Sequence, residues 1–175
     1  RDATLWVGGG LFALRDSEWH AYQSTLNIPY PSHRTRLLEA SDGALWIIGL
    51  GQEAARLDLS KSKWVTYEGL KFQAETSDGA QWFVSRDSGV VRYVPSSGKW
   101  VRYGVEDGLM DRPTSLIVTQ SGTIWAAGAH KGVSATAQLL SPSASTGHQW
   151  QRQTHPQISR FTAIQQIYEF ADGNI

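Results

Sequence analysis

The stretch Asp78-Gly79-Ala80-Gln81-Trp82 belongs to a phrase that occurs four times in this 175-residue chain. The other copies, whose tryptophans follow one another at 36 to 43 residues, are Asp2-Ala3-Thr4-Leu5-Trp6, Asp42-Gly43-Ala44-Leu45-Trp46 and Ser121-Gly122-Thr123-Ile124-Trp125. Asp172-Gly173-Asn174-Ile175 begins a fifth copy. Strand-like repeats of about 40 residues are typical of blade arrays, because one such unit cannot bury its own apolar faces. The phrase therefore predicts a β-propeller.

A second aromatic phrase follows each first tryptophan and supports the repeat. Its copies are Trp19-His20-Ala21-Tyr22, Trp64-Val65-Thr66-Tyr67, Trp100-Val101-Arg102-Tyr103 and the degraded Trp150-Gln151-Arg152-Gln153, so the repeat accounts for all eight tryptophans. In a propeller each blade is packed on both faces by its neighbours. We therefore expect these side chains to pack between blades, with Trp46, Trp82 and Trp125 largely buried.

Each unit is expected to hold four short strands separated by turns. Asp-Gly or Ser-Gly between the first two strands is a strong hairpin signal, since a type I′ turn needs φ > 0 at both central residues. Strands are predicted at 35–40, 44–48, 53–58, 63–67, 80–84, 89–93, 99–103, 115–120, 123–127 and 161–170, and no segment has a helical period. The fold class is all-β, a propeller of four-stranded blades in one domain. The repeat units are approximately 1–34, 35–70, 71–111 and 112–158, with a fifth beginning at 159–175.

The repeat resembles a known family. Asp-Gly-x-Leu-Trp-Ile, Gly-Val-x-Arg-Tyr, Lys-Trp-x-x-Tyr and Glu106-Asp107-Gly108-Leu109-Met110 are similar to the two-component regulator propeller repeat, best over residues 78–128. That family builds seven-bladed propellers, often in pairs, in the extracytoplasmic part of hybrid sensor kinases. The resemblance implies a non-catalytic ligand-sensing module of a signal-transduction protein, in the periplasm. A further resemblance, to the streptogramin lyase propeller, implies a lyase as the alternative, and a protein–protein interaction scaffold is the third reading.

The length of the chain leaves the number of blades open. Seven blades of about 40 residues would need roughly 280 residues. The chain is therefore expected to be part of a larger seven- or eight-bladed ring, a four-bladed ring in which 161–170 completes the first unit, or half of a homodimeric eight-bladed ring. Open sheet edges invite pairing. The expected partners are accordingly further propeller blades or a second copy of the chain.

Composition excludes several function classes. The 16 basic residues balance the 16 acidic ones, so nucleic acid and direct membrane insertion are not expected. The absence of cysteine excludes disulfides and thiolate chemistry and is compatible with an oxidising compartment. The five histidines form no metal-binding spacing, and no calcium loop occurs, so no cofactor or metal is expected. His33 comes nearest to the histidine that the lyase resemblance would require.

One group of residues points to a binding site. Basic side chains recur between the last strand of one unit and the first strand of the next, and two units add them in the turn after the second strand. Propeller topology brings these connections to one face, where arginine could bind a carboxylate in a bidentate manner and an aromatic ring could stack on a sugar. The predicted ligand is small and anionic or sugar-like. The candidate residues are Arg34, Arg36, Arg86, Arg112, His130, Lys131, Arg160 and Tyr30.

Overall fold

The computed structural model describes residues 5–7, 12–15, 17–21, 36–50, 53–58, 63–87, 89–140, 149–158 and 163–175. These residues form strands and turns, with one 3₁₀ turn at Val105–Asp107. The strands make four antiparallel sheets, three of them four-stranded, which confirms the all-β propeller-blade architecture. The chain divides into two compact units, Arg1–Lys71 and Phe72–Ile175.

The first unit holds two sheets. One is three-stranded in the order β1 (Leu5–Val7), β2 (Phe12–Arg15) and β3 (Glu18–Ala21). The other is four-stranded in the order β4 (Arg36–Glu39), β5 (Leu45–Leu50), β6 (Glu53–Asp58) and β7 (Lys63–Glu68). Each strand pairs with the next one in the chain, as expected of a blade.

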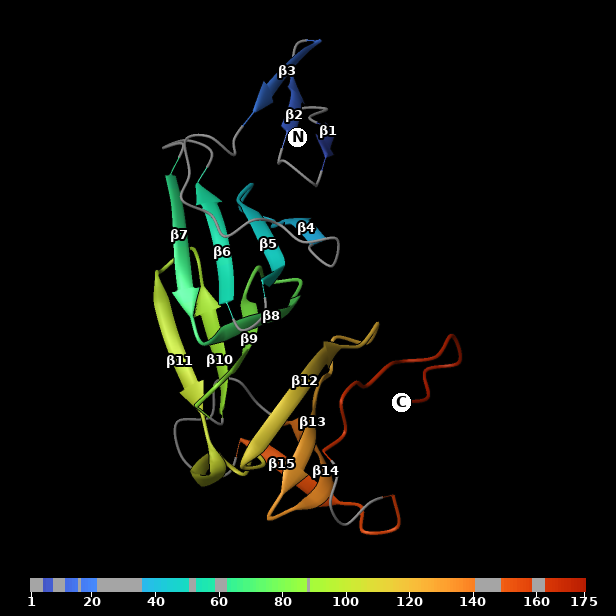
Figure 1. The fold of residues 1–175 in the computed structure, drawn as a ribbon. Helices are drawn as coiled ribbons and strands as arrows, with labels where there is room; N and C mark the ends of the chain where they lie inside the picture. Colours follow the sequence, from blue (N-terminus) through green and yellow to red (C-terminus); the bar gives the residue numbers. More distant parts are fainter. Residues whose placement is uncertain are drawn as a thin grey trace. The chain divides into compact units, whose positions relative to one another are not determined.

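The second unit holds two four-stranded sheets (Figure 1). The third sheet runs β8 (Leu70–Glu75), β9 (Gln81–Ser85), β10 (Gly89–Val94) and β11 (Lys99–Tyr103). The fourth runs β12 (Arg112–Val118), β13 (Ile124–His130), β14 (Val133–Leu139) and β15 (Trp150–Thr154). β8, β14, β15 and the β1–β3 sheet were not among the predicted strand ranges, whereas the predicted strands from 35 to 127 are found with ends shifted by a few residues.

The repeated phrase forms the same turn in each four-stranded sheet. Between β8 and β9, Thr76 N donates to Ala80 O (2.9 Å) and Gly79 N donates to Thr76 O (2.8 Å). Gly79 has φ +78°, a left-handed conformation that glycine adopts without steric cost. The turns before β5 and β13 repeat both hydrogen bonds, with Gly43 and Gly122 at φ +79° and +82°. The Asp-Gly phrase is thus the hairpin between the first two strands.

The core of the second unit lies between its two sheets. Trp82 stacks on Tyr103 with ring centroids 5.8 Å apart, and both rings meet Trp150 of the neighbouring sheet edge-on, at 6.4 and 5.9 Å. Small side chains such as Ala126 and Ala135 fill the opposite wall. Tryptophans therefore hold these two blades together, as the sequence predicts.

The tryptophans differ in burial. Trp46 and Trp82 are fully buried, as predicted, whereas Trp125 is less buried than they are. Side chains alternate across a strand. Trp125 therefore lies on the other side of its sheet from Ile124 and Ala126, whose side chains fill the core. In the second aromatic phrase Trp150 is buried, whereas Trp19 and Trp100 are 55% and 39% exposed, so not every tryptophan packs between blades.

The strand predicted at 161–170 is not found. Residues 163–170, drawn in red, carry no strand arrow (Figure 1). A strand requires a hydrogen-bonded ladder with a neighbour. Among the described residues no strand pairs with this segment, so its alternating sequence alone is insufficient.

Candidate functional site

The structure brings three of the predicted site residues to one end of the fourth sheet. Arg112 begins β12 and pairs with Ala129, while His130 ends β13 and Lys131 follows it in the turn to β14. We call Asp111, Arg112, His130 and Lys131 the basic end. Arg112 and Lys131 are exposed, and the side chain of His130 is 11% exposed.

Asp111 organises the basic end. Its Oδ2 accepts a hydrogen bond from Lys131 N (3.0 Å), and its Oδ1 lies 3.8 Å from His130 Nδ1. Lys131 and Gly132 have φ of +49° and +79°, as a tight I′-type hairpin requires, so the aspartate holds a strained turn. Asp111 Oδ1 and His130 Nδ1 are both buried without a hydrogen-bond partner in the described structure.

The charge state of His130 follows from its surroundings. Burial lowers the pKa of His130, the cations Arg152 and Lys131 lower it further, and Asp111 opposes both effects. Arg152 is fixed in place because its Nη1 donates to Leu109 O (2.5 Å). The net direction is below the ordinary value, so His130 is mostly neutral at pH 7.

The other predicted residues are not shown to join this group. Arg86 is exposed in the turn after β9, at the equivalent end of the third sheet. Arg36 begins β4 in the first unit, whereas the basic end belongs to the second unit. Arg34, Tyr30 and Arg160 lie outside the described residues, as does His33. The predicted site as a whole stays a prediction.

A groove of about 820 Å³ opens at the opposite end of the strands of the second unit. It is bordered by the turns at 76–78 and 119–123, with Trp82, Arg92 and Gln138 deeper in the strands. Hydroxyl, amide and carboxylate groups dominate this border. The groove lies at the turn joining the first two strands of each sheet, not at the basic end.

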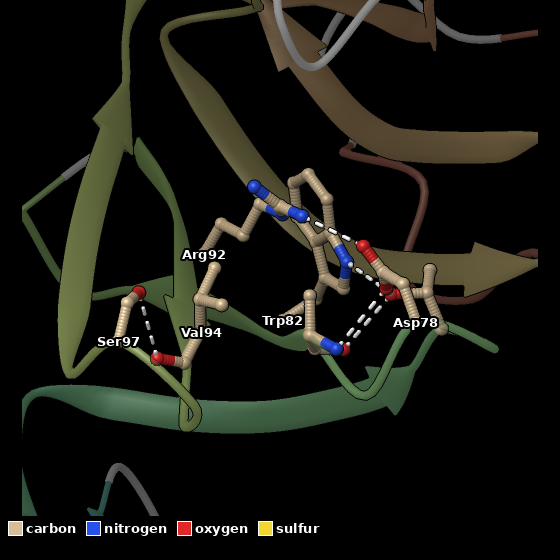
Figure 2. Close-up of polar contacts among 7 residues, drawn as sticks. Asp78, Trp82, Arg92, Val94 and Ser97 are labelled. Carbon is tan, nitrogen blue, oxygen red and sulfur yellow. Dashed lines mark hydrogen bonds and ion pairs between the residues drawn. The ribbon is translucent and has the colours of Figure 1, made fainter.

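Asp78 is anchored on one side of the groove (Figure 2). Its Oδ1 accepts hydrogen bonds from Ala80 N (3.1 Å) and Thr76 Oγ1 (2.5 Å), and its Oδ2 pairs with Arg92 (2.8 Å). The Arg92 guanidinium also lies 5.8 Å from the centroid of the Trp82 ring. Burial acts to raise the pKa of Asp78, but the hydrogen bonds from Thr76 and Ala80 and the charge of Arg92 outweigh it, so the pKa is lowered.

We call this arrangement, a turn aspartate that accepts from its own turn and pairs with an arginine on the neighbouring strand, the ionic clamp. The same clamp occurs in the second sheet. Asp42 Oδ1 accepts from Ala44 N (3.0 Å), and Asp42 Oδ2 pairs with Arg56 (2.5 Å), which lies opposite Trp46 in the strand register. Sequence reasoning missed both arginines, although each follows its tryptophan by ten residues. This spacing could have identified them, since it matches the cross-strand pairs Trp46↔Arg56 and Trp82↔Arg92.

The fourth sheet replaces the ionic clamp with neutral groups. Ser121 stands where the other turns have aspartate, and Gln138 pairs with Trp125 where they have arginine. Thr119 Oγ1 accepts a hydrogen bond from Thr123 N (2.9 Å), and this bond stabilises the turn in place of the aspartate. The carboxylates of the repeated phrase therefore stabilise turns in the sheets that carry them.

The described residues contain no group of side chains with metal-binding geometry, and no helix among them has the length and apolarity needed to cross a membrane. No protein-family model matches the chain, and no curated protein matches it.

Two solved structures are similar. The extracellular domain of BT4673 from B. thetaiotaomicron, a protein assigned to the one-component systems, matches 98% of this chain with a TM-score of 0.57 and 13% identity. The extracellular domain of BT3049 from the same organism, assigned to the hybrid two-component systems, matches 86% with a TM-score of 0.38 and 18% identity. The chain spans 24% and 26% of those two chains. The first match shows that this chain shares its fold with a segment of that extracellular domain.

Proposed function

We propose that the chain is a non-catalytic, ligand-sensing propeller module of an extracytoplasmic sensor of the two-component type. The repeat resemblance and the fold shared with an extracellular domain of a signalling protein support this proposal. The observation that carries it is the basic end of the fourth sheet, which brings the exposed residues Arg112 and Lys131 together with Asp111 and the largely buried His130.

The chemistry of the basic end favours a ligand that carries both a carboxylate and hydroxyl groups. The exposed cations Arg112 and Lys131 attract an anion, and arginine can bind a carboxylate with two parallel hydrogen bonds. Asp111 would repel a simple anion, but its side chain is 37% exposed, and its Oδ2, which accepts from Lys131 N, keeps a lone pair that could accept a hydrogen bond from a ligand hydroxyl. A sugar acid satisfies both requirements.

Binding of D-galacturonate to the 175-residue chain tests this proposal, with neutral D-galactose as the matched control. Saturating galacturonate should raise the melting temperature, since ligand at 100 times Kd stabilises the native state by about 2.7 kcal/mol. Arg112→Ala and Lys131→Ala should each weaken binding at least tenfold. Lys99→Ala, an exposed lysine at the start of β11, should leave it unchanged.

Three results would refute the proposal. One is equal stabilisation by galactose and galacturonate, and another is an affinity that Arg112→Ala does not alter. The third is cleavage of oligogalacturonate by β-elimination of a glycosidic oxygen, which gives an unsaturated, ultraviolet-absorbing uronate and would indicate the lyase alternative.

A further inference from the structure

His130 lies at the basic end with a ring nitrogen that forms no hydrogen bond. Its side chain is 11% exposed, and its Nδ1 lies 3.8 Å from Asp111 Oδ1. Both atoms are buried, and neither has a hydrogen-bond partner in the described residues. The separation exceeds the range of a hydrogen bond, so the neutral imidazole lies beside the carboxylate without bonding to it. A proton on Nδ1 would lie between these two groups.

Protonation of His130 would complete this contact. A neutral imidazole has one donor nitrogen, whereas both ring nitrogens donate in the imidazolium. Nδ1–H of a charged His130 would then donate to Asp111 Oδ1, and hydrogen bonds between two charged groups are shorter and stronger than neutral ones. For this bond Nδ1 and Oδ1 need to approach by about 1 Å. Asp111 Oδ2 remains free to keep its bond from Lys131 N (3.0 Å), so the turn can stay as it is.

The charged groups around His130 decide at which pH it binds the proton. Asp111, in the connection before β12, favours the charged ring, whereas Lys131, in the turn after β13, and Arg152, on β15, oppose it. Arg112, at the start of β12, is a further cation next to Asp111. Burial and the cations prevail, so the pKa of His130 lies below its ordinary value and the ring is neutral at pH 7. A negative charge added at this end would favour the proton.

A bound carboxylate supplies such a charge. In the proposed function, on which this inference rests, the ligand carboxylate binds to Arg112 and Lys131, and Lys131 follows His130 directly in the chain. The negative charge of the ligand offsets part of the effect of these cations on the imidazole ring. Protonation of His130 in turn neutralises Asp111, which otherwise repels the anion. Each event therefore favours the other, as the linkage between two binding sites requires.

We propose that His130 takes up a proton when a carboxylate ligand binds at the basic end, so that this site binds its ligand more tightly as the pH falls below 7. The effect is confined to one pH range. Above the pKa that His130 has in the complex, the ring is neutral with and without ligand. Below the pKa that it has in the free chain, the ring is charged in both states, so the affinity changes only between these two values. One linked proton limits the change to about tenfold per pH unit.

Arg152 sets the position of this pH range. Its Nη1 donates to Leu109 O (2.5 Å), and Leu109 is fully buried, so the guanidinium is held in place near the ring. A fixed cation lowers the pKa of His130 in the free chain and in the complex alike. Arg152→Gln should therefore move the whole range to higher pH without removing it. This variant leaves the groups assigned to the ligand unchanged.

Isothermal titration calorimetry with D-galacturonate at about pH 5.5, 6.5 and 7.5, the interval in which histidine titrates, tests the inference at constant ionic strength. The carboxyl group of this ligand stays ionised throughout the interval. The affinity should rise about three- to tenfold from the highest to the lowest pH. Titrations at the middle pH, in buffers of different ionisation enthalpy, should show proton uptake on binding. NMR should give a higher pKa for His130 in the complex than in the free chain.

Two histidine variants assign the proton. His130→Gln should abolish the proton uptake and the change of affinity with pH, whereas His155→Gln should retain both, because His155 Nε2 already has a hydrogen-bond partner in Thr136 Oγ1 (2.8 Å). Absence of galacturonate binding at every pH would refute the proposed function and this inference with it. Binding of equal affinity at the three pH values without proton uptake would overturn this inference alone, as would uptake that persists in His130→Gln. If His130→Gln does not fold, an equal pKa of His130 in the free chain and in the complex overturns it.

Discussion

Truncation of Trp82 to alanine probes the packing between the third and fourth sheets. Trp82 is 1% exposed and contacts Tyr103, Trp150 and the Arg92 guanidinium. A buried tryptophan removes up to about 250 Å² from water, worth about 6 kcal/mol at 25 cal/mol/Å². Residual burial in the unfolded chain reduces this to about 4 kcal/mol, within the usual range for such truncations. We expect Trp82→Ala to lower the free energy of unfolding by about 4 kcal/mol.

Urea denaturation followed by circular dichroism measures the loss, with the slope m compared between variants to check that the unfolding transition is unchanged. Trp100→Ala is the control, because Trp100 lies in the same sheet but is 39% exposed and stacks mainly on Tyr93 (4.3 Å). By the same calculation its smaller buried area should cost about 2.5 kcal/mol. If Trp82→Ala does not unfold cooperatively, Trp82→Phe replaces it. Equal losses for Trp82→Ala and Trp100→Ala, or a loss below about 1 kcal/mol for the former, would show that the sheets do not pack through Trp82.

Three further outcomes are expected. Asp78→Asn should lower the free energy of unfolding at pH 7 by about 1 kcal/mol. Because the pKa of Asp78 is depressed in the folded chain, the difference from the unaltered chain should disappear as pH falls below about 4. A difference that persists at lower pH would contradict the clamp. Gly128→Ala should cost about 1–3 kcal/mol in urea denaturation, since the added Cβ would lie 2.1 Å from Arg112 O, and a neutral result would exclude the close approach of Gly128 to Arg112. The pKa of His130, measured by NMR, should lie below 6.5, and it should be higher in Arg152→Gln and lower in Asp111→Asn than in the unaltered chain. The free energy of unfolding should decline as pH falls through 6.5, because the unfolded chain binds the proton first. An unchanged pKa in Arg152→Gln would exclude the Arg152 charge as a cause.

The local signals in the sequence were sufficient for the blade. The Asp-Gly phrase predicts a turn with a left-handed glycine, followed by a strand. The structure has this turn, with Gly79 at positive φ and a hydrogen bond from Thr76 N to Ala80 O. Such turns depend on neighbouring residues only, so each copy could be interpreted by itself. The spacing of the copies then predicted the propeller, because repeated half-buried units must stack.

Contacts between distant residues could not be inferred in the same way. The Asp78–Arg92 clamp joins residues 14 apart through the strand register, and sequence reasoning assigned the aspartate to the turn alone. The predicted strand at 161–170 has the required alternation, but a strand exists only with a partner. Trp125 occupies the same position in the repeat as Trp82 and is less buried, because burial depends on what covers that side of the sheet.

The sequence by itself therefore determined where the Asp-Gly and Ser-Gly hairpins lie, the all-β class and the repeated blade. Only the tertiary structure decided which tryptophans are buried, that Asp111 and His130 meet at the basic end, and that Gly128 O accepts a hydrogen bond from Ile164 N. The physical reason is the range of the interactions. Turn geometry and side-chain alternation are encoded within a few residues, whereas burial, ion pairing and strand pairing depend on groups that approach one another only after the sheets have packed.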